Sequence, residues 1–255
     1  MLWDLLVRGA KALLPERFWP AARRGYRLVR YGGRSFECPC CGGRFRTFLP
    51  GGVHPRPNAS CPSCQSLERH RLVLLYLRQE TDLFRGGLRF LDVAPIPPLE
   101  RVFRRIRGLR YVTLDLEAPA VAVRADLMEL PFRDASFDAV LCSHVLEHVR
   151  DDRRAMREVL RVLAPGGWAL LQSPVDEARA ATFEDPAAHS PQERERLFGQ
   201  ADHVRVYGRD YADRLREAGF AVSVDPYAQR MGPALARRFG LPPDAGVHLC
   251  RKPTP

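Results

Sequence analysis

Short apolar runs alternate with amphipathic stretches along the C-terminal two thirds of the chain. The runs have the length of buried strands, whereas the stretches between them repeat apolar positions at helical spacing. The patterns predict strands at 88–93, 110–114, 121–124, 137–142 and 167–173, with helices at 98–107 and 150–163. Such alternation is typical of an α/β domain with a mostly parallel sheet covered on both faces.

The segments on either side of this pattern differ from it in composition. A charged stretch at 176–206 precedes a predicted helix at 208–218 and predicted strands at 219–225 and 246–251. Before the pattern, residues 66–80 predict a helix with Ser66 as its N-cap. Residues 1–33 mix leucine, tryptophan and arginine, and predict helices on either side of Pro15. This basic amphipathic segment suits a membrane surface, a partner, or a helix packed on its own domain.

The length and hydrophobic content allow one main core. A chain of 255 residues with 45% hydrophobic content holds one α/β domain and a small appendage, and is too short for two full-sized domains. No apolar run approaches the length of a membrane span. The apolar start, Met1 to Val7, has no basic region before it and no clear cleavage site. We therefore expect a cytoplasmic protein, with peripheral membrane contact through residues 1–33 left open.

Most of the formal net charge of +10 belongs to the N-terminal third. Residues 1–80 contain 14 lysines and arginines against 5 acidic residues. A basic face of this kind could bind nucleic acid. Because nearly all the basic residues are arginine, a GC-rich genome would produce the same excess, and the charge does not decide between the two.

Five of the seven cysteines lie close together, in a pattern that predicts a metal site. Four of them form two Cys-x-x-Cys turns, Cys38 with Cys41 and Cys61 with Cys64. Each turn lets two thiolates converge on one tetrahedral ion, which predicts zinc, with an iron centre or a decayed site as the alternative. Four thiolates leave no open coordination position, so the zinc should be structural.

The role of the predicted zinc knuckle is less clear from the sequence than its ligands are. Cys40 is the spare cysteine, and His54 is a weaker candidate ligand. A basic zinc knuckle can contact RNA, but many such knuckles only brace a neighbouring helix. Because Cys64 runs directly into the helix predicted at 66–80, we favour bracing.

Acidic residues end the first two strands of the α/β pattern. The stretch "FLDVAPIPPLE" ends its strand at Asp92, and "YVTLDLE" ends the next at Asp115, 23 residues later. An acid at the end of a second strand is placed to accept hydrogen bonds from a ribose diol. The spacing therefore favours a nucleoside-containing cofactor.

Two later stretches carry motifs of a known family: "VRADLMELPFRDASFDAVLCSHVLEHV" and "VLAPGGWALLQSPV". From about 88 to 252 the chain resembles the class I S-adenosylmethionine-dependent methyltransferases, and in particular a bacterial group with a zinc knuckle. The resemblance implies a Rossmann-like sheet of seven strands ending in an antiparallel hairpin, with S-adenosylmethionine as cofactor. It implies ribose binding by Asp115, adenine contact by Asp126 with Leu127, and a methionine site near Asp92. The full set of cofactor-binding residues that it implies is Asp92, Ala94, Pro95, Asp115, Leu116, Asp126, Leu127, Ser143 and His144.

The loop after Asp92 departs from the family pattern, which has glycines there. Prolines 95, 97 and 98 have no backbone N–H, and the side chains at 94 and 96 fill space that glycine leaves empty. Of the residues that follow Asp92, only Val93, Ala94, Ile96 and Leu99 keep a donor. Shape and the flanking acids must then replace part of the usual contact between backbone and cofactor.

The segment "FGQADHVRVYGRDY" carries the candidate catalytic groups. We predict His203 as general base, oriented by Asp202, with Arg205 or Tyr207 contacting the acceptor. A hydrogen-bonded lid that braces the helix at 208–218 is the alternative. The motif "HVLEH", residues 144–148, also fits an inverted zinc peptidase pattern, but its position after a parallel strand disfavours that activity and favours a helix-face packing role for His148.

These features predict methyl transfer to oxygen or nitrogen of a small-molecule or sugar acceptor. An RNA methyltransferase that docks through the basic knuckle and a non-catalytic binding module are the alternatives. We expect a basic segment at 1–33, a zinc knuckle at 34–65, and a methyltransferase domain at 66–255 with an acceptor lid at about 176–207.

Overall fold

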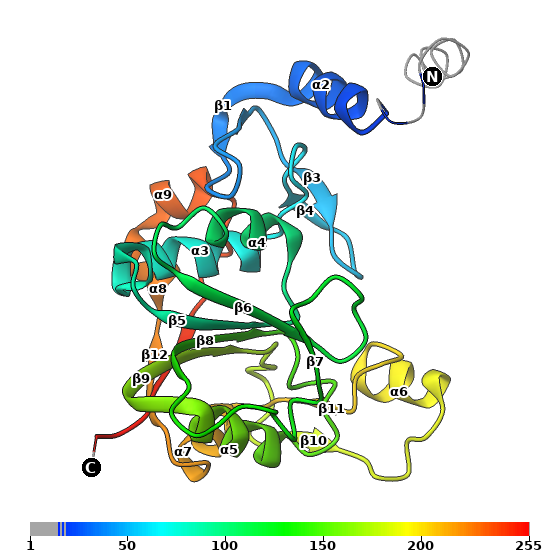
Figure 1. The fold of residues 1–255 in the computed structure, drawn as a ribbon. Helices are drawn as coiled ribbons and strands as arrows, with labels where there is room; N and C mark the ends of the chain where they lie inside the picture. Colours follow the sequence, from blue (N-terminus) through cyan, green and yellow to red (C-terminus); the bar gives the residue numbers. More distant parts are fainter. Residues whose placement is uncertain (1–14, 16, 18, 255) are drawn as a thin grey trace. The chain divides into compact units, whose positions relative to one another are not determined.

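The computed structural model describes residues 15, 17 and 19–254, so the helix predicted before Pro15 lies outside the described residues. The chain divides into two compact units. The first comprises the chain up to Leu75 together with Ala228–Asp244, and the second comprises Tyr76–Tyr227 and Ala245–Pro255. Residues 228–244, predicted as part of the domain at 66–255, group with the first unit. We describe each unit by itself (Figure 1).

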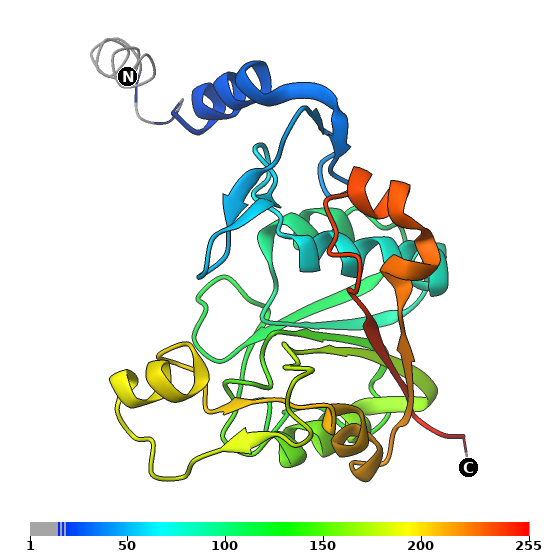
Figure 2. The ribbon, with the colours of Figure 1, turned by 180° about the vertical axis from the view of Figure 1, so that it is seen from behind.

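The second unit is built on one seven-stranded sheet with the order β12-β13-β9-β8-β5-β6-β7. The strands β5 to β9 pair in parallel, whereas β13 is antiparallel to β9 and β12 is antiparallel to β13. Figure 2 shows this last pair in orange and red. The strands are β5 Arg89–Val93, β6 Arg110–Asp115, β7 Val123–Arg124, β8 Phe137–Ser143, β9 Leu163–Gln172, β12 Ala221–Asp225 and β13 Val247–Arg251. The predicted Rossmann-like sheet with its antiparallel hairpin is confirmed.

The burial of the central strands explains why their sequences read as continuous apolar runs. In β8, Ala139 to Ser143 are all buried, as expected for a parallel strand covered on both faces. One face packs against α5 Asp152–Val162 and α7 Tyr211–Glu217, which contribute Met156, Val159 and Leu215 to the core. On β5, Phe90 packs edge-on against Phe103 of α4 Pro97–Phe103. The same helices are seen on opposite sides of the sheet in Figure 1.

Several boundaries differ from the sequence predictions, for local reasons. The helix predicted at 98–107 ends at Phe103, and the chain turns before Gly108, whose φ is 75°. The strand predicted at 167–173 begins at Leu163, because the Pro-Gly-Gly turn lies in a bulge where β8 and β9 lose register. Ser66 is not an N-cap: the helix α3 Glu68–Glu80 begins two residues later, and the Ser66 hydroxyl lies 3.1 Å from Cys38 Sγ.

The charged stretch at 176–206 contains structure that the hydrophobic pattern did not show. It holds the strands β10 Phe183–Glu184 and β11 Arg205–Val206, which pair antiparallel, and the helix α6 Pro191–Phe198. Ser190 and Glu193 form a reciprocal capping box at the start of α6. The sequence "SPQE" carries that signal, so the helix was detectable from its cap although its apolar face is narrow.

The first unit consists of short elements around the cysteines. The helix α2 Trp19–Tyr31 leads into the antiparallel pair β1 Gly32–Glu37 and β2 Arg44–Phe45, and a second pair follows, β3 Leu49–Gly51 with β4 Arg56–Ser60. The helix α3 runs across the division between the units. The helix α9 Pro233–Arg238 also belongs to the first unit, and α8 Tyr227–Met231 begins at the boundary between the units. In the second unit, a 3-10 turn, η2 Leu83–Arg85, follows α3.

The Arg71 side chain joins the distant parts of the first unit. It is fully buried and donates to the carbonyl oxygens of Ala59, Ser66, Phe239 and Gly240 at 2.6 to 2.9 Å. Burial lowers the pKa of its guanidinium, against the effect of nearby acidic groups. Four backbone carbonyls from three separate segments thus share one donor side chain, although that of Ser66 also accepts from the N–H of Cys61.

No helix among the described residues is long and apolar enough to cross a membrane.

We predict that Arg71→Met lowers the free energy of unfolding by about 3 kcal/mol, because it leaves buried carbonyls without a donor. Thermal and urea unfolding monitored by circular dichroism would measure this. Arg78→Met on the exposed end of the same helix is the matched control and should change stability by less than about 0.5 kcal/mol. Equal effects of the two substitutions would contradict the structural role of Arg71.

Candidate functional site

The parallel strands of the second unit end at one edge of the sheet. Asp92 lies at the end of β5, Asp115 ends β6, Ser143 ends β8 and Gln172 ends β9. In open α/β sheets, ligands bind outside the carboxyl ends of the strands, where loops and polar side chains converge. The residues that the sequence analysis assigned to the cofactor therefore gather at the expected edge.

Asp92 is a buried carboxylate at this edge with a strongly raised pKa. Its side chain is 2% exposed, and one carboxylate oxygen accepts a 2.6 Å hydrogen bond from the hydroxyl of Tyr111 on β6. Burial raises the pKa of Asp92 to about 7, although the hydrogen bond from Tyr111 opposes the shift. The sequence analysis did not single out Tyr111, since a tyrosine on a strand carries no specific signal.

The proline loop uses most of its remaining donors inside the protein. Ala94 has a positive φ of 52°, and its N–H donates to the carbonyl oxygen of Leu114 at 2.8 Å. Pro97 starts α4, and the N–H of Leu99 donates to the Ile96 carbonyl at 2.9 Å. The loop is thus held against β6. Because its backbone N–H groups are used within the protein, it would contact a ligand mainly through its surface shape and less through hydrogen bonds.

Asp115 and Asp126 each use one carboxylate oxygen to accept hydrogen bonds from the backbone of the turn that follows, and in the part of the chain that the structure describes their second oxygen is not used in this way. Oδ1 of Asp115 accepts from the N–H groups of Glu117 and Ala118, both at 2.8 Å, and Oδ1 of Asp126 accepts from Met128 at 2.8 Å. No hydrogen bond between described residues involves Oδ2 of either carboxylate. Leu116 is 60% exposed although it is a large apolar residue, and Leu127 is buried. A carboxylate beside an exposed apolar side chain suits a ribose attached to a base.

The sequence HVLEH after β8 forms a turn in the structure and not a helix. His144 has a positive φ of 59°, and its N–H donates to the Gln172 carbonyl at 2.7 Å. Its Nδ1 lies 3.1 Å from Oε1 of Glu147, whose Oε2 accepts from the Ser173 hydroxyl at 2.9 Å. Burial would raise the pKa of Glu147, but the adjacent His144 holds it below its ordinary value. The expected helix-face position of His148 is therefore wrong, because the chain turns here.

His203 lies against this turn. It is buried, and its ring packs edge-on against the ring of His148 with centroids 4.7 Å apart. Burial and the neighbouring His148 lower the pKa of His203, which keeps the imidazole neutral and able to accept a proton. The backbone carbonyl and the carboxylate of Asp202 both lie 3.2 Å from Nδ1 of His148, so Asp202 orients His148 directly and not the ring of His203.

Arg205 and Tyr207 are held in the interior. The Arg205 guanidinium donates to the carbonyls of Leu146, Val149 and Arg150, and pairs with Glu184 at 2.8 Å. The Tyr207 hydroxyl is fully buried and donates to Oδ2 of Asp152 at 2.8 Å. Both side chains tie the segment that carries His203 to the turn after β8 and to Asp152 of α5, whereas the lid predicted as the alternative would brace the helix at 208–218.

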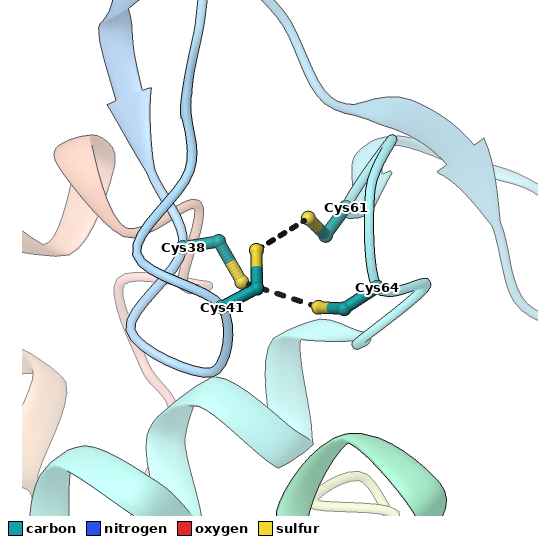
Figure 3. A group of neighbouring side chains, drawn as sticks. All are labelled: Cys38, Cys41, Cys61 and Cys64. Carbon is teal, nitrogen blue, oxygen red and sulfur yellow. Dashed lines mark hydrogen bonds between the residues drawn. The ribbon is translucent and has the colours of Figure 1, made fainter. Parts of the chain in front are cut away.

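The four cysteines of the predicted metal site come together in the first unit (Figure 3). Cys38 Sγ lies 3.6 Å from Cys64 Sγ, and Cys41 Sγ lies 3.7 Å from Cys61 Sγ. Thiolates at about 2.3 Å from a tetrahedral zinc are about 3.8 Å apart, so the four sulfurs fit that ion. The Ser66 hydroxyl, within 3.3 Å of both Cys38 and Cys64, is placed to support the thiolates. Cys40 and His54 are not part of the group.

Comparison with known proteins agrees with this architecture. A family model for a methyltransferase domain matches residues 99–171. The chain is 35% identical over 145 residues to 27-O-demethylrifamycin SV methyltransferase of Amycolatopsis mediterranei, covering 55% of this chain and 52% of the relative. It is 35% identical over 181 residues to demethylmenaquinone methyltransferase of Corynebacterium glutamicum, covering 68% of this chain and 62% of that protein. The chain thus spans roughly half to three fifths of the length of these relatives.

Among solved structures, the [4+2]-cyclase SpnF aligns with a TM-score of 0.55 and 22% identity, covering 92% of this chain and 97% of that one. At this identity the likeness shows the fold alone.

We predict that Asp92→Asn stabilises the protein near neutral pH. Free aspartate ionises near pH ~4, whereas the pKa of Asp92 in the folded protein is about 7. Between these values the folded state binds a proton that the unfolded state has lost, so wild-type stability falls as pH rises through this window and stays lower above it. The melting temperature of Asp92→Asn relative to wild type should therefore increase from about pH 4 to about pH 8. Melting curves of the two proteins that stay parallel across this range would contradict the raised pKa.

Proposed function

Because the chain belongs to the class I S-adenosylmethionine-dependent methyltransferase family, we propose that it transfers a methyl group from S-adenosylmethionine to an oxygen or nitrogen of a small-molecule acceptor. The observation that carries the proposal is the gathering of Asp92 and Asp115 at the same sheet edge as the turn after β8. The names of the two relatives above support a small organic acceptor, and a sugar remains within that class.

The residues at the edge fit the cofactor by their chemistry. Asp115 retains an oxygen for the ribose hydroxyls, and the exposed Leu116 beside it offers an apolar surface. Asp126 with Leu127 would face the adenine. Asp92 would meet the methionine ammonium directly or through water, and a nearby cation would favour the ionised carboxylate that burial disfavours. Ala94 and Pro95 would contribute shape.

The donor arrives activated, since a sulfonium supplies an electrophilic methyl group. The tasks left to the protein are to align the acceptor and to receive its proton. Ser143 ends β8 and His144 follows it beside the proposed methionine site, and His203, whose pKa is lowered, packs against His148 of that turn. We assign proton acceptance to His203, with Asp202 acting through His148, and leave Arg205 and Tyr207 to support the loop.

The cysteine group is proposed to hold one structural zinc. Its four ligands would complete a tetrahedral shell with no open position, so the ion would stabilise the short hairpins of the first unit and take no part in the reaction.

Isothermal titration with S-adenosylhomocysteine should show saturable binding of one ligand per chain. Asp115→Asn keeps one oxygen for the turn to Glu117 and Ala118 but loses the charge, so affinity should fall about tenfold. Asp213→Asn, an exposed acid paired with Arg216 on α7, is the matched control and should bind as wild type does. An absence of binding at roughly millimolar ligand would favour a non-catalytic module instead.

Removing one cysteine ligand should release the structural zinc. Cys61→Ser should lose about one equivalent of zinc by mass spectrometry and melt at a markedly lower temperature, because the hairpins have little apolar core of their own. Cys40→Ser, which alters the spare thiol, should keep both properties. Equal zinc content in wild type and Cys61→Ser would rule out the tetrathiolate site.

A further inference from the structure

A second group of metal-ligand side chains lies in the second unit. Glu147, His148 and His203 each offer a ligand atom, and these atoms all lie within 4.8 Å of one another. Two histidines and one carboxylate make up a donor set that binds divalent transition ions, zinc included. Donors bound to one zinc ion at about 2.1 Å are about 3.4 Å apart, so small side-chain rotations would bring the three into contact with an ion.

Glu147 is a buried carboxylate whose neighbouring positive groups are imidazoles. Its side chain is 2% exposed, and among ion pairs of described residues its partner is His144, which carries charge only when protonated. Its two oxygens receive one hydrogen bond each, from His144 and Ser173, although a carboxylate can accept about four. A buried carboxylate is costly without a counter-charge, which a cation would supply.

His148 is arranged as metal-bound histidines usually are. Its Nδ1 donates to the backbone carbonyl of Asp202 at 3.2 Å, with the Asp202 carboxylate also 3.2 Å away, so the proton lies on Nδ1 and Nε2 keeps a lone pair. Among described residues no hydrogen bond engages the ring of His203. Both imidazoles therefore have a nitrogen available for an ion.

The two segments that supply the ligands are joined before any ion binds. The N–H of Val204 donates to the Glu147 carbonyl at 2.9 Å, and Arg205 donates to the carbonyls of Leu146 and Arg150. This bracing holds the three side chains near a common centre, so little ordering is needed on binding.

We propose that Glu147, His148 and His203 bind one divalent cation, separate from the ion of the four cysteines. Three protein ligands leave a coordination position open, and an oxygen of the acceptor fits that position. The role at the acceptor rests on the proposed methyl transfer, whereas the site itself does not. With the cation bound, His203 is a ligand and no longer the proton acceptor; the acceptor hydroxyl on the cation then loses its proton to water more readily.

Titration of the zinc-loaded full-length protein with cobalt(II) chloride tests the site, because cobalt reports its ligands by its visible spectrum. We expect one further equivalent of cobalt with nitrogen and oxygen ligands, seen as d–d bands without the thiolate-to-cobalt charge-transfer band of a cysteine site. His203→Ala should weaken binding at least tenfold, whereas Asp202→Asn, which removes the carboxylate charge beside His148 but keeps the backbone carbonyl that accepts from it, should weaken binding about threefold.

His189→Ala, an exposed histidine of the same unit, is the matched control and should bind cobalt as wild type does. Glu147→Gln tests the carboxylate ligand, and its melting curve shows whether this variant is folded. If it is not, Asp202→Asn still tests the site, because the Asp202 side chain is largely exposed and its substitution should not unfold the protein. No further cobalt in wild type, or unchanged cobalt binding in His203→Ala, overturns the proposal. Because the titration contains no S-adenosylhomocysteine, its failure leaves the proposed methyl transfer standing, and failed cofactor binding leaves the metal site standing.

Discussion

The candidate site depends on one buried guanidinium. The chain after β8 forms an irregular turn, and the carbonyls of Leu146, Val149 and Arg150 all accept from Arg205. Glu184 balances the charge at 2.8 Å, so the guanidinium can stay in the interior. Since these bonds join the turn with Glu147 to the segment with His203, the proposed chemistry relies on a residue that touches no reactant.

The other half of the site is constrained by the proline loop. Glycines in this position would leave backbone donors facing a ligand, whereas here Ala94 donates to Leu114 and the prolines have no donor. In the proposed site, recognition of the cofactor therefore falls to the carboxylates of Asp92 and Asp115. Burial of the Asp92 carboxylate lowers the stability of the protein near neutral pH. This cost fits a carboxylate that serves to bind a cation, such as the proposed methionine ammonium, and does not serve packing.

The first unit is held together by a few cross-linking side chains and not by a large apolar core. Its strands are two to six residues long and cannot bury a large core, so cross-links take the place of apolar area. The thiols of Cys38, Cys41, Cys61 and Cys64 converge on one centre, and Arg71 ties the C-terminal segment to them through four carbonyls. Both units thus hold irregular backbone in place with a buried arginine.

The sequence by itself determined a mostly parallel sheet, through the alternation of strands and helices, the cysteine group, through its spacing, and the acids at the strand ends. The seven strands and the antiparallel hairpin were implied by the family resemblance, and the strand order came from the structure. The sequence did not reveal Tyr111 beside Asp92, the pairing of Asp202 with His148, or the inward position of Arg205 and Tyr207. Each of these is a contact between residues 19 to 61 positions apart or a matter of which way a side chain faces in an irregular loop. No periodic pattern encodes such contacts; only the packing of the folded chain decides them.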